Sequence, residues 1–100
     1  MIRLARKEDA EQLLQLCNQF NGEGETNQEH IEQSILQNRQ EIVVVAEESG
    51  VLAGFVCVQM KKSLCYHKVS PEITEVFVRE GYRRKGLASG MIAFAENYCL

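Results

Sequence analysis

The chain has 100 residues, of which 45% are hydrophobic and 25% charged, so it is long enough for one small globular domain and too short for two. Its formal net charge of −3 excludes a chain built as a whole to coat nucleic acid. The N-terminus has no signal-peptide core, and no stretch is long and apolar enough to span a membrane. We therefore expect a cytoplasmic protein with no membrane partner.

The first forty residues are predicted to form a short strand followed by two helices. Residues 1–6 alternate between apolar and polar side chains, as a strand does. Residues 9–20 repeat apolar side chains at helical spacing, with Asp9 and Gln12 placed as a capping box. After a loop with two glycines, residues 27–38 carry a thinner apolar stripe and predict a second helix, with Thr26 opening its capping box.

The remaining residues are predicted to form three strands and a last helix. The β-branched run and the turn within residues 41–62 indicate a hairpin, in which Gly54 marks a bulge or a close backbone approach. Residues 61–71 are predicted to be a loop, and residues 72–78 a strand. The last helix is expected to begin near Arg83. The order β-α-α-β-β-β-α predicts one mixed α/β domain over residues 1–100, with a mostly antiparallel sheet flanked by helices.

The four cysteines predict reduced thiols and no metal site. Cys17 and Cys57 fall on apolar faces, and no pair has the spacing of a metal-binding or redox motif. Cys65 and His67 offer two ligands, but two further ligands are not evident.

A cluster of basic residues precedes the last helix. Arg83, Arg84 and Lys85 stand at a helix N-terminus, where the helix dipole disfavours cations. A bound phosphate would reverse this penalty, because free N–H groups and basic side chains both attract it, and Gly86 and Ala88 would let it approach the backbone. The alternative is a solvated basic turn with no ligand.

The stretch "VFVREGYRRKGLASGMI" resembles the acetyl-CoA-binding motif of the GNAT family of N-acetyltransferases. The motif is Gln/Arg-x-x-Gly-x-Gly/Ala, and Arg83, Gly86 and Ala88 meet it here. As in the family, the motif follows a strand and opens a helix. The order of the preceding elements is also similar, so that the resemblance spans essentially the whole chain.

This resemblance implies transfer of an acetyl group from acetyl-CoA to an amine, on a small molecule or a protein. Main-chain N–H groups from Arg84 to Ala88 would hold the pyrophosphate of the cofactor, and the preceding strand would pair with its pantetheine arm. A strand N–H would polarise the carbonyl oxygen. The implied cofactor-binding residues are Val76, Phe77, Val78, Arg83, Arg84, Lys85, Gly86, Leu87 and Ala88.

Two carboxylates are candidates for the base that deprotonates the amine. Glu72 matches the position of the base in the histone-modifying members of the family, and Glu75 lies closer to the cofactor strand. Because they stand three residues apart on a strand, we expect them to face opposite sides. The alternative is that both are ordinary solvated residues and that water takes the proton.

Acidic residues also surround the loop between the first two helices. Glu23, Glu25 and Glu29 lie in the region that lines the acceptor site in the family, where they would suit a cationic amine. The alternative is a polar loop and helix start with no binding role. The identity of the acceptor stays open.

The sequence ends at "AENYCL", where members of the family continue with a fifth strand and further elements. The cofactor of the family lies between strands four and five, and its general-acid tyrosine would lie beyond this end. The alternative function is therefore a non-catalytic CoA-binding or interaction module. An exposed strand edge would also favour a homodimer that completes the sheet, and a fragment is equally compatible.

A nucleic-acid-binding domain is the third possibility, through Arg79 and the basic turn. The acidic net charge and the lack of aromatic residues among the basic ones argue against it.

Overall fold

The computed structural model describes residues 1–99, apart from the side chain of Tyr66. Four strands, three α-helices and two short 3₁₀ helices are described in this range. In chain order they are β1 (Ile2–Leu4), η1 (Lys7–Asp9), α1 (Ala10–Asn21), α2 (Gln28–Gln37), β2 (Glu41–Glu48), β3 (Val51–Ser63), β4 (Tyr66–Val78), η2 (Glu80–Tyr82) and α3 (Leu87–Tyr98).

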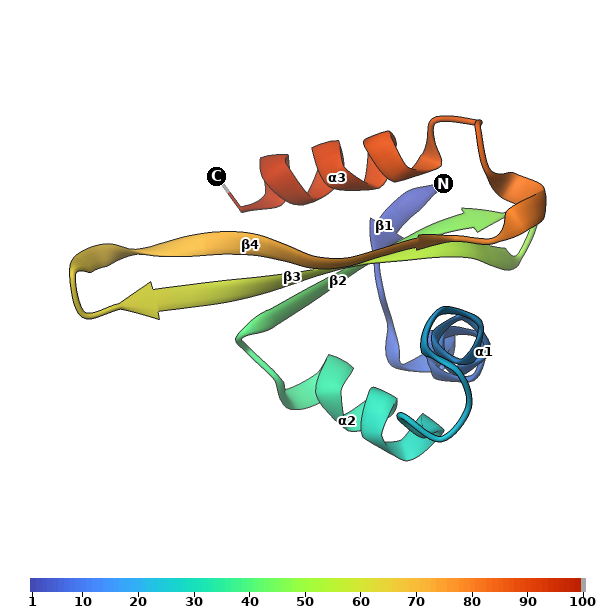
Figure 1. The fold of residues 1–100 in the computed structure, drawn as a ribbon, viewed down its shortest axis with the longest axis horizontal. Helices are drawn as coiled ribbons and strands as arrows, with labels where there is room; N and C mark the ends of the chain where they lie inside the picture. Colours follow the sequence, from blue (N-terminus) through green and yellow to red (C-terminus); the bar gives the residue numbers. More distant parts are fainter. Residues whose placement is uncertain (100) are drawn as a thin grey trace.

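The strands form one antiparallel sheet in the order β1-β2-β3-β4. Helix α3 lies on one face of this sheet, and α1 and α2 lie on the other (Figure 1). The mixed α/β class and the β-α-α-β-β-β-α order of the main elements are confirmed. No helix among residues 1–99 is long and apolar enough to cross a membrane.

The two faces have separate cores, because side chains alternate along each strand. The α3 face buries Val44, Ala46, Val56, Val58, Met91 and Ala95. The α1/α2 face buries Leu13, Leu16, Val45, Leu52 and Phe55. A bulge in the β2–β3 pairing, after Ala46, shifts the alternation by one residue and so places Leu52 in the second core.

The predicted loop over residues 61–71 is wrong, because strands β3 and β4 continue through it as a long hairpin (Figure 1). Its side chains are mostly exposed, so the segment lacks the alternation that marks a half-buried strand. Pro71 pairs with Met60 within this hairpin. A proline is tolerated there because β4 is an edge strand, whose outer N–H groups need no partner in the sheet.

The predicted capping box at Asp9 is also wrong. The Asp9 carboxylate makes no capping bond to α1 and instead accepts two hydrogen bonds from the guanidinium of Arg3, at 2.7 and 2.9 Å. It also accepts the N–H of Arg6 at 2.7 Å. Gln12 accepts the Leu52 N–H at 2.7 Å, which ties α1 to the start of β3. These bonds join β1, α1 and β3 on the α1/α2 face.

Two helix starts differ from prediction by a few residues. Helix α2 is capped by Asn27, which accepts the His30 N–H at 2.8 Å, one residue after the predicted Thr26. Helix α3 begins at Leu87 and not near Arg83. The basic residues therefore lie in a turn before the helix, which opens the end of that helix to solvent.

Candidate functional site

The turn between β4 and α3 has an unusual backbone. Arg84 and Gly86 both adopt positive φ angles, of 65° and 76°. The left-handed conformation is uncommon for a residue with a side chain, so Arg84 is held in a strained geometry of the kind that gathers at functional sites. A Cβ on Gly86 would meet nothing within 4 Å, so the space in front of this glycine is open.

The first turn of α3 leaves its N–H groups free of intrahelical partners, as every helix start does. The first backbone hydrogen bond at this end of the helix is the one that the Gly90 N–H donates to the Gly86 carbonyl, at 2.9 Å. The N–H groups earlier in this turn therefore have no partner in the helix. Free N–H groups and the positive end of the helix dipole make this turn attractive to an anion.

A cavity of about 400 Å³ lies at this turn and at the end of β4. Its lining includes seven of the nine predicted cofactor residues, namely Val76, Val78, Arg83, Arg84, Gly86, Leu87 and Ala88, together with Tyr82 and Ser89. The other two, Phe77 and Lys85, do not line it. Phe77 packs in the core of the opposite face, and the Lys85 Nζ lies 5.4 Å from the centre of the Tyr82 ring.

Arg83 folds back onto the end of β4. Its Nε donates to the Val78 carbonyl at 2.8 Å, and its guanidinium lies 5.9 Å from the centre of the Phe77 ring. This arrangement holds the turn against the strand, so the contact made by this side chain is structural here. Any role for it in binding phosphate stays a prediction.

The outer edge of β4 is free. In the described part of the chain β4 pairs with β3 alone, so its other edge presents N–H and C=O groups to solvent. Gly54 of β3 lets this part of β4 come close, because a Cβ there would lie 2.4 Å from the Phe77 carbonyl oxygen. The predicted close approach at Gly54 is thus confirmed.

Glu72 and Glu75 share one face of the sheet, which corrects the expectation that they face opposite sides. Glu75 pairs with Cys57 and Glu72 pairs with Gln59, although the glutamates stand three positions apart and their partners only two. Thr74 is the extra residue of a β-bulge. Since Cys57 and Gln59 point to the same side, their partners do too.

The two glutamates nevertheless have different surroundings. Glu72 is exposed on the hairpin and forms an ion pair with Lys61. Glu75 is half-buried, accepts a hydrogen bond from the Thr74 hydroxyl, and lies beside Glu41 and Cys57. The carboxylates of Glu41 and Glu75 and the thiol of Cys57 lie within 4.8 Å of one another.

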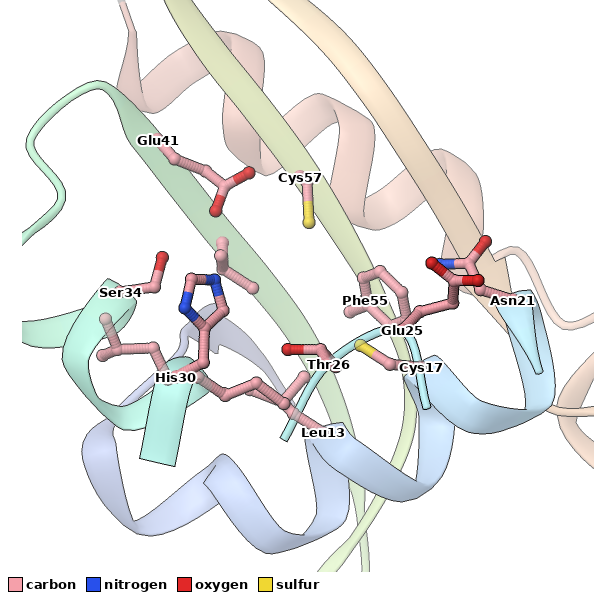
Figure 2. Close-up of a pocket in the computed structure, with 13 residues that line it drawn as sticks. Leu13, Cys17, Asn21, Glu25, Thr26, His30, Ser34, Glu41, Phe55 and Cys57 are labelled. Atoms are coloured by element: carbon pink, nitrogen blue, oxygen red, sulfur yellow. The ribbon is translucent and has the colours of Figure 1, made fainter. Parts of the chain in front are cut away.

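A second cavity, of about 330 Å³, lies between α1, α2 and the sheet. Figure 2 shows the carboxyl group of Glu41, the thiol of Cys57 and the imidazole of His30 facing this space from β2, β3 and α2. Its lining residues are Leu13, Cys17, Asn21, Glu25, Thr26, His30, Ile31, Ser34, Ile35, Glu41, Val43, Phe55 and Cys57. Of the three acids predicted near an acceptor, Glu25 lines the cavity, whereas Glu23 and Glu29 do not.

Burial controls the protonation of the groups on this face. Burial and then the nearby Glu75 raise the pKa of Glu41 above its ordinary value. Burial, Glu41 and Glu75 raise the pKa of the Cys57 thiol, and burial and Glu75 raise that of Cys17. Both thiols are therefore neutral at pH 7 and are not activated nucleophiles.

Sequence reasoning missed Glu41 and the role of Cys57 in this group. Glu41 stands at the start of a β-branched run, where a glutamate reads as an ordinary solvated strand end. Its approach to Glu75 depends on pairing across three strands and on the bulge at Thr74. No spacing within the sequence signals either.

Comparison with known proteins establishes the family of the chain. The model of the acetyltransferase (GNAT) family matches residues 7–100, so the chain belongs to this family. It is accordingly a GNAT-type N-acetyltransferase, and the resemblance found in its sequence is confirmed. No curated protein matches the chain in sequence.

Solved structures of acetyltransferases share the fold. A ribosomal-protein-alanine N-acetyltransferase from Brucella melitensis biovar Abortus 2308 is 21% identical, with a TM-score of 0.83 over 97% of this chain and 69% of its own. An aminoglycoside N-acetyltransferase in complex with CoA is 22% identical, with a TM-score of 0.80 over 99% and 69%. An aminoglycoside acetyltransferase from an uncultured soil metagenomic sample is 17% identical, with a TM-score of 0.83 over 98% and 68%. The chain thus spans about two thirds of the length of these structures.

Proposed function

We propose that the chain transfers an acetyl group from acetyl-CoA to a primary amine, with the cofactor pyrophosphate at the turn of residues 83–88. The observation that carries this proposal is the strained turn itself. Positive φ angles at Arg84 and Gly86 open the N-terminus of α3 toward a cavity at the end of β4. An anion at this point would use the free N–H groups and offset the repulsion among the basic side chains. Structures of similar fold in complex with CoA support acetyl-CoA as the donor.

The free edge of β4 supports a path for the pantetheine arm. From a pyrophosphate beyond Val78, an extended arm can run back along the strand and pair with the backbone of residues 76–78. This direction takes the thioester toward Glu75 and the bulge at Thr74. A backbone N–H near the bulge would polarise the thioester carbonyl.

The chemistry then requires one proton acceptor. The neutral amine attacks the carbonyl carbon, the C–S bond breaks, and the CoA thiolate leaves and takes up a proton. Glu75 is favoured over Glu72 as the group that receives the proton of the amine, directly or through water, because it lies nearer the expected thioester. The ion pair of Glu72 with Lys61 and its exposure make it the weaker candidate.

Calorimetric titration with acetyl-CoA tests the proposed cofactor site. We expect Gly86→Glu to lower the affinity at least a hundredfold, because it places a carboxylate and a strained φ where the pyrophosphate would lie. Gly50→Glu is the matched control, since Gly50 also has a positive φ and open space around it but lies in the β2–β3 turn. Failure of the folded wild-type chain to bind acetyl-CoA, or equal losses in both variants, would contradict the proposal.

A second candidate function is a CoA-binding or interaction module that does not transfer acetyl groups. The observation that favours it is the free edge of β4, which can pair with a second copy of the chain. Acetyl transfer to a panel of amines separates the two functions, and the mass of the protein in solution tests the homodimer. We also propose a cytoplasmic location, since the four cysteines are free.

A further inference from the structure

We propose that the cavity between α1, α2 and the sheet is the acceptor site, and that it selects a compact primary ammonium ion carried on an apolar body, such as an aralkylamine. This inference rests on the proposed function and names the class of amine. It is carried by the size of the cavity, by its apolar walls, by its charged floor and by its connection to β4.

The size of the cavity limits the acceptor. Its volume is about 330 Å³. Water occupies about 30 Å³ per molecule in the liquid, so the space corresponds to roughly eleven non-hydrogen atoms. A single ring with a short amino chain fits this volume. An amine with several linked rings would remain mostly outside.

The walls of the cavity are apolar. Leu13 of α1, Ile31 and Ile35 of α2, and Val43 and Phe55 of the sheet line it. These side chains can cover the body of the ligand and exclude water from it, which is the arrangement typical of small-molecule sites. The rest of the lining is polar and includes Asn21, Glu25, Thr26, His30 and Ser34, so the cavity suits a ligand with an apolar body and a polar end.

The floor of the cavity carries a carboxylate, and the basic side chain that faces it is the imidazole of His30. Glu41 lines the cavity, and Glu75 lies beside it within the 4.8 Å cluster that includes Cys57. The hydrogen-bond partner of the Glu41 carboxylate across the sheet is the neutral amide of Gln59, at 2.9 Å. No lysine or arginine is among the residues that line the cavity. An ammonium ion would supply a full positive charge and three hydrogen-bond donors to these carboxylates.

Glu75 connects this floor to the place where acetyl transfer would occur. It belongs to β4, whose free edge is the proposed path of the pantetheine arm. An ammonium ion held between Glu41 and Glu75 is thus at the expected end of the thioester. The raised pKa of Glu41 reflects its partial burial and then its closeness to Glu75, and an ammonium ion between the two carboxylates would relieve their repulsion.

Direct binding of phenethylamine, measured by calorimetry with and without bound CoA, tests the inference. We expect 2-phenylethanol, which has the same body without the charge, and ethylamine, which has the charge without the body, to bind at least tenfold more weakly. We expect Glu41→Gln to weaken phenethylamine at least tenfold, and Ile35→Phe to weaken it by filling the cavity. Glu11→Gln is the matched control, because Glu11 is exposed on α1 and does not line the cavity.

The outcomes separate this inference from the proposed function. If acetyl-CoA binds but phenethylamine does not, with or without CoA, the inference is overturned and the proposed function stands. If phenethylamine binds as expected but acetyl-CoA does not, the amine site is supported and acetyl transfer is not. Equal affinity for phenethylamine and 2-phenylethanol, or an undiminished affinity in Glu41→Gln, would also overturn the inference. Tighter binding of a multi-ring aminoglycoside or of a peptide N-terminus would assign the cavity to another class of amine.

Discussion

The two faces of the sheet are built from the same strands but differ in what they bury. On the α3 face, Met91 and Ala95 of the helix close a continuous apolar core with the alternate residues of β2 and β3. On the α1/α2 face, the helices stand over a cavity of about 330 Å³ whose floor includes Glu41 and Cys57. The buried residues of the α3 face are all apolar, whereas the α1/α2 face has half-buried carboxylates beside its cavity.

This difference indicates that one face mainly stabilises the fold and that the other mainly offers a place for a ligand. An apolar core around the buried Met91 and Ala95 stabilises the sheet and fixes α3, whose first turn is the proposed pyrophosphate site. A partly open face with half-buried carboxylates costs stability and offers a place for a ligand. Matched substitutions on the two faces should therefore change the free energy of unfolding by different amounts.

The largest expected effect comes from truncating Met91. Its side chain is 0% exposed, so Met91→Ala leaves a cavity in an apolar core and should lower the free energy of unfolding by about 3 kcal/mol. Ile35→Ala is the matched change on the other face, where the half-buried side chain already borders open space. We expect a loss of about 1 kcal/mol there. Chemical denaturation measures both, and equal losses would contradict the division between the faces.

The next effect concerns how the two faces hold their helices. Helix α3 is held by apolar packing, whereas the start of α1 is held by the bonds from Arg3 to Asp9, which is 6% exposed. Burial alone would raise the pKa of Asp9, but the hydrogen bonds from Arg3 and from the Arg6 N–H outweigh it and lower the pKa. Asp9→Asn should therefore cost about 2 kcal/mol at pH 7.

The sign of the pH dependence follows from this lowered pKa. The stabilisation by Asp9 is present above the pKa of the unfolded state, about 3.9, and is lost as the pH falls through the lower pKa of the folded state. The difference between the wild type and Asp9→Asn should thus shrink in acid. Glu47→Gln is the control, because Glu47 contacts the same arginine but is more exposed, and it should cost under about 1 kcal/mol. A constant difference from pH 7 to pH 2 would contradict this account.

Local patterns in the sequence predicted the α3 face and the turn that precedes its helix. The alternation of apolar residues in β2 and their helical spacing in α3 indicate which side chains are buried, because residues at these spacings share one face of the strand or helix. The motif of Arg83, Gly86 and Ala88 is equally local, since these residues themselves form the turn and the start of the helix. Its position before α3 was correct, although the helix itself begins at Leu87.

The α1/α2 face could not be predicted in the same way. The shared orientation of Glu72 and Glu75 depends on the bulge at Thr74, and a bulge is a property of strand pairing. The approach of Glu41 depends on the register of three strands. Beyond Gln59 the side chains on both faces of the hairpin are exposed, so apolar and polar residues do not alternate there. The sequence of these strands therefore resembles that of a loop.

The smallest expected effect is a gain of stability from Glu41→Gln. Burial and the nearby Glu75 raise the pKa of Glu41, so the stabilisation from its bound proton is present in acid and is lost as the pH rises through the raised pKa of the folded state. At pH 8 the charged carboxylate therefore costs stability. A neutral glutamine avoids this cost, and we expect the variant to exceed the wild type by under about 1 kcal/mol.

Thermal or chemical unfolding of Glu41→Gln from pH 4 to pH 8 checks this expectation, with the advantage of the variant growing as the pH rises. The groups that face Glu41 are Glu75 of β4, Cys57 of β3 and His30 of α2. His30 lowers the pKa of Glu41 through its charge, so the comparison is repeated in the His30→Gln background. Glu96→Gln on α3 is the control from the other face, where the glutamate is exposed and should give no such trend. If Glu41→Gln instead destabilises the chain at pH 8, the charge on Glu41 stabilises the fold. The α1/α2 face would then not be the face where a binding site costs stability.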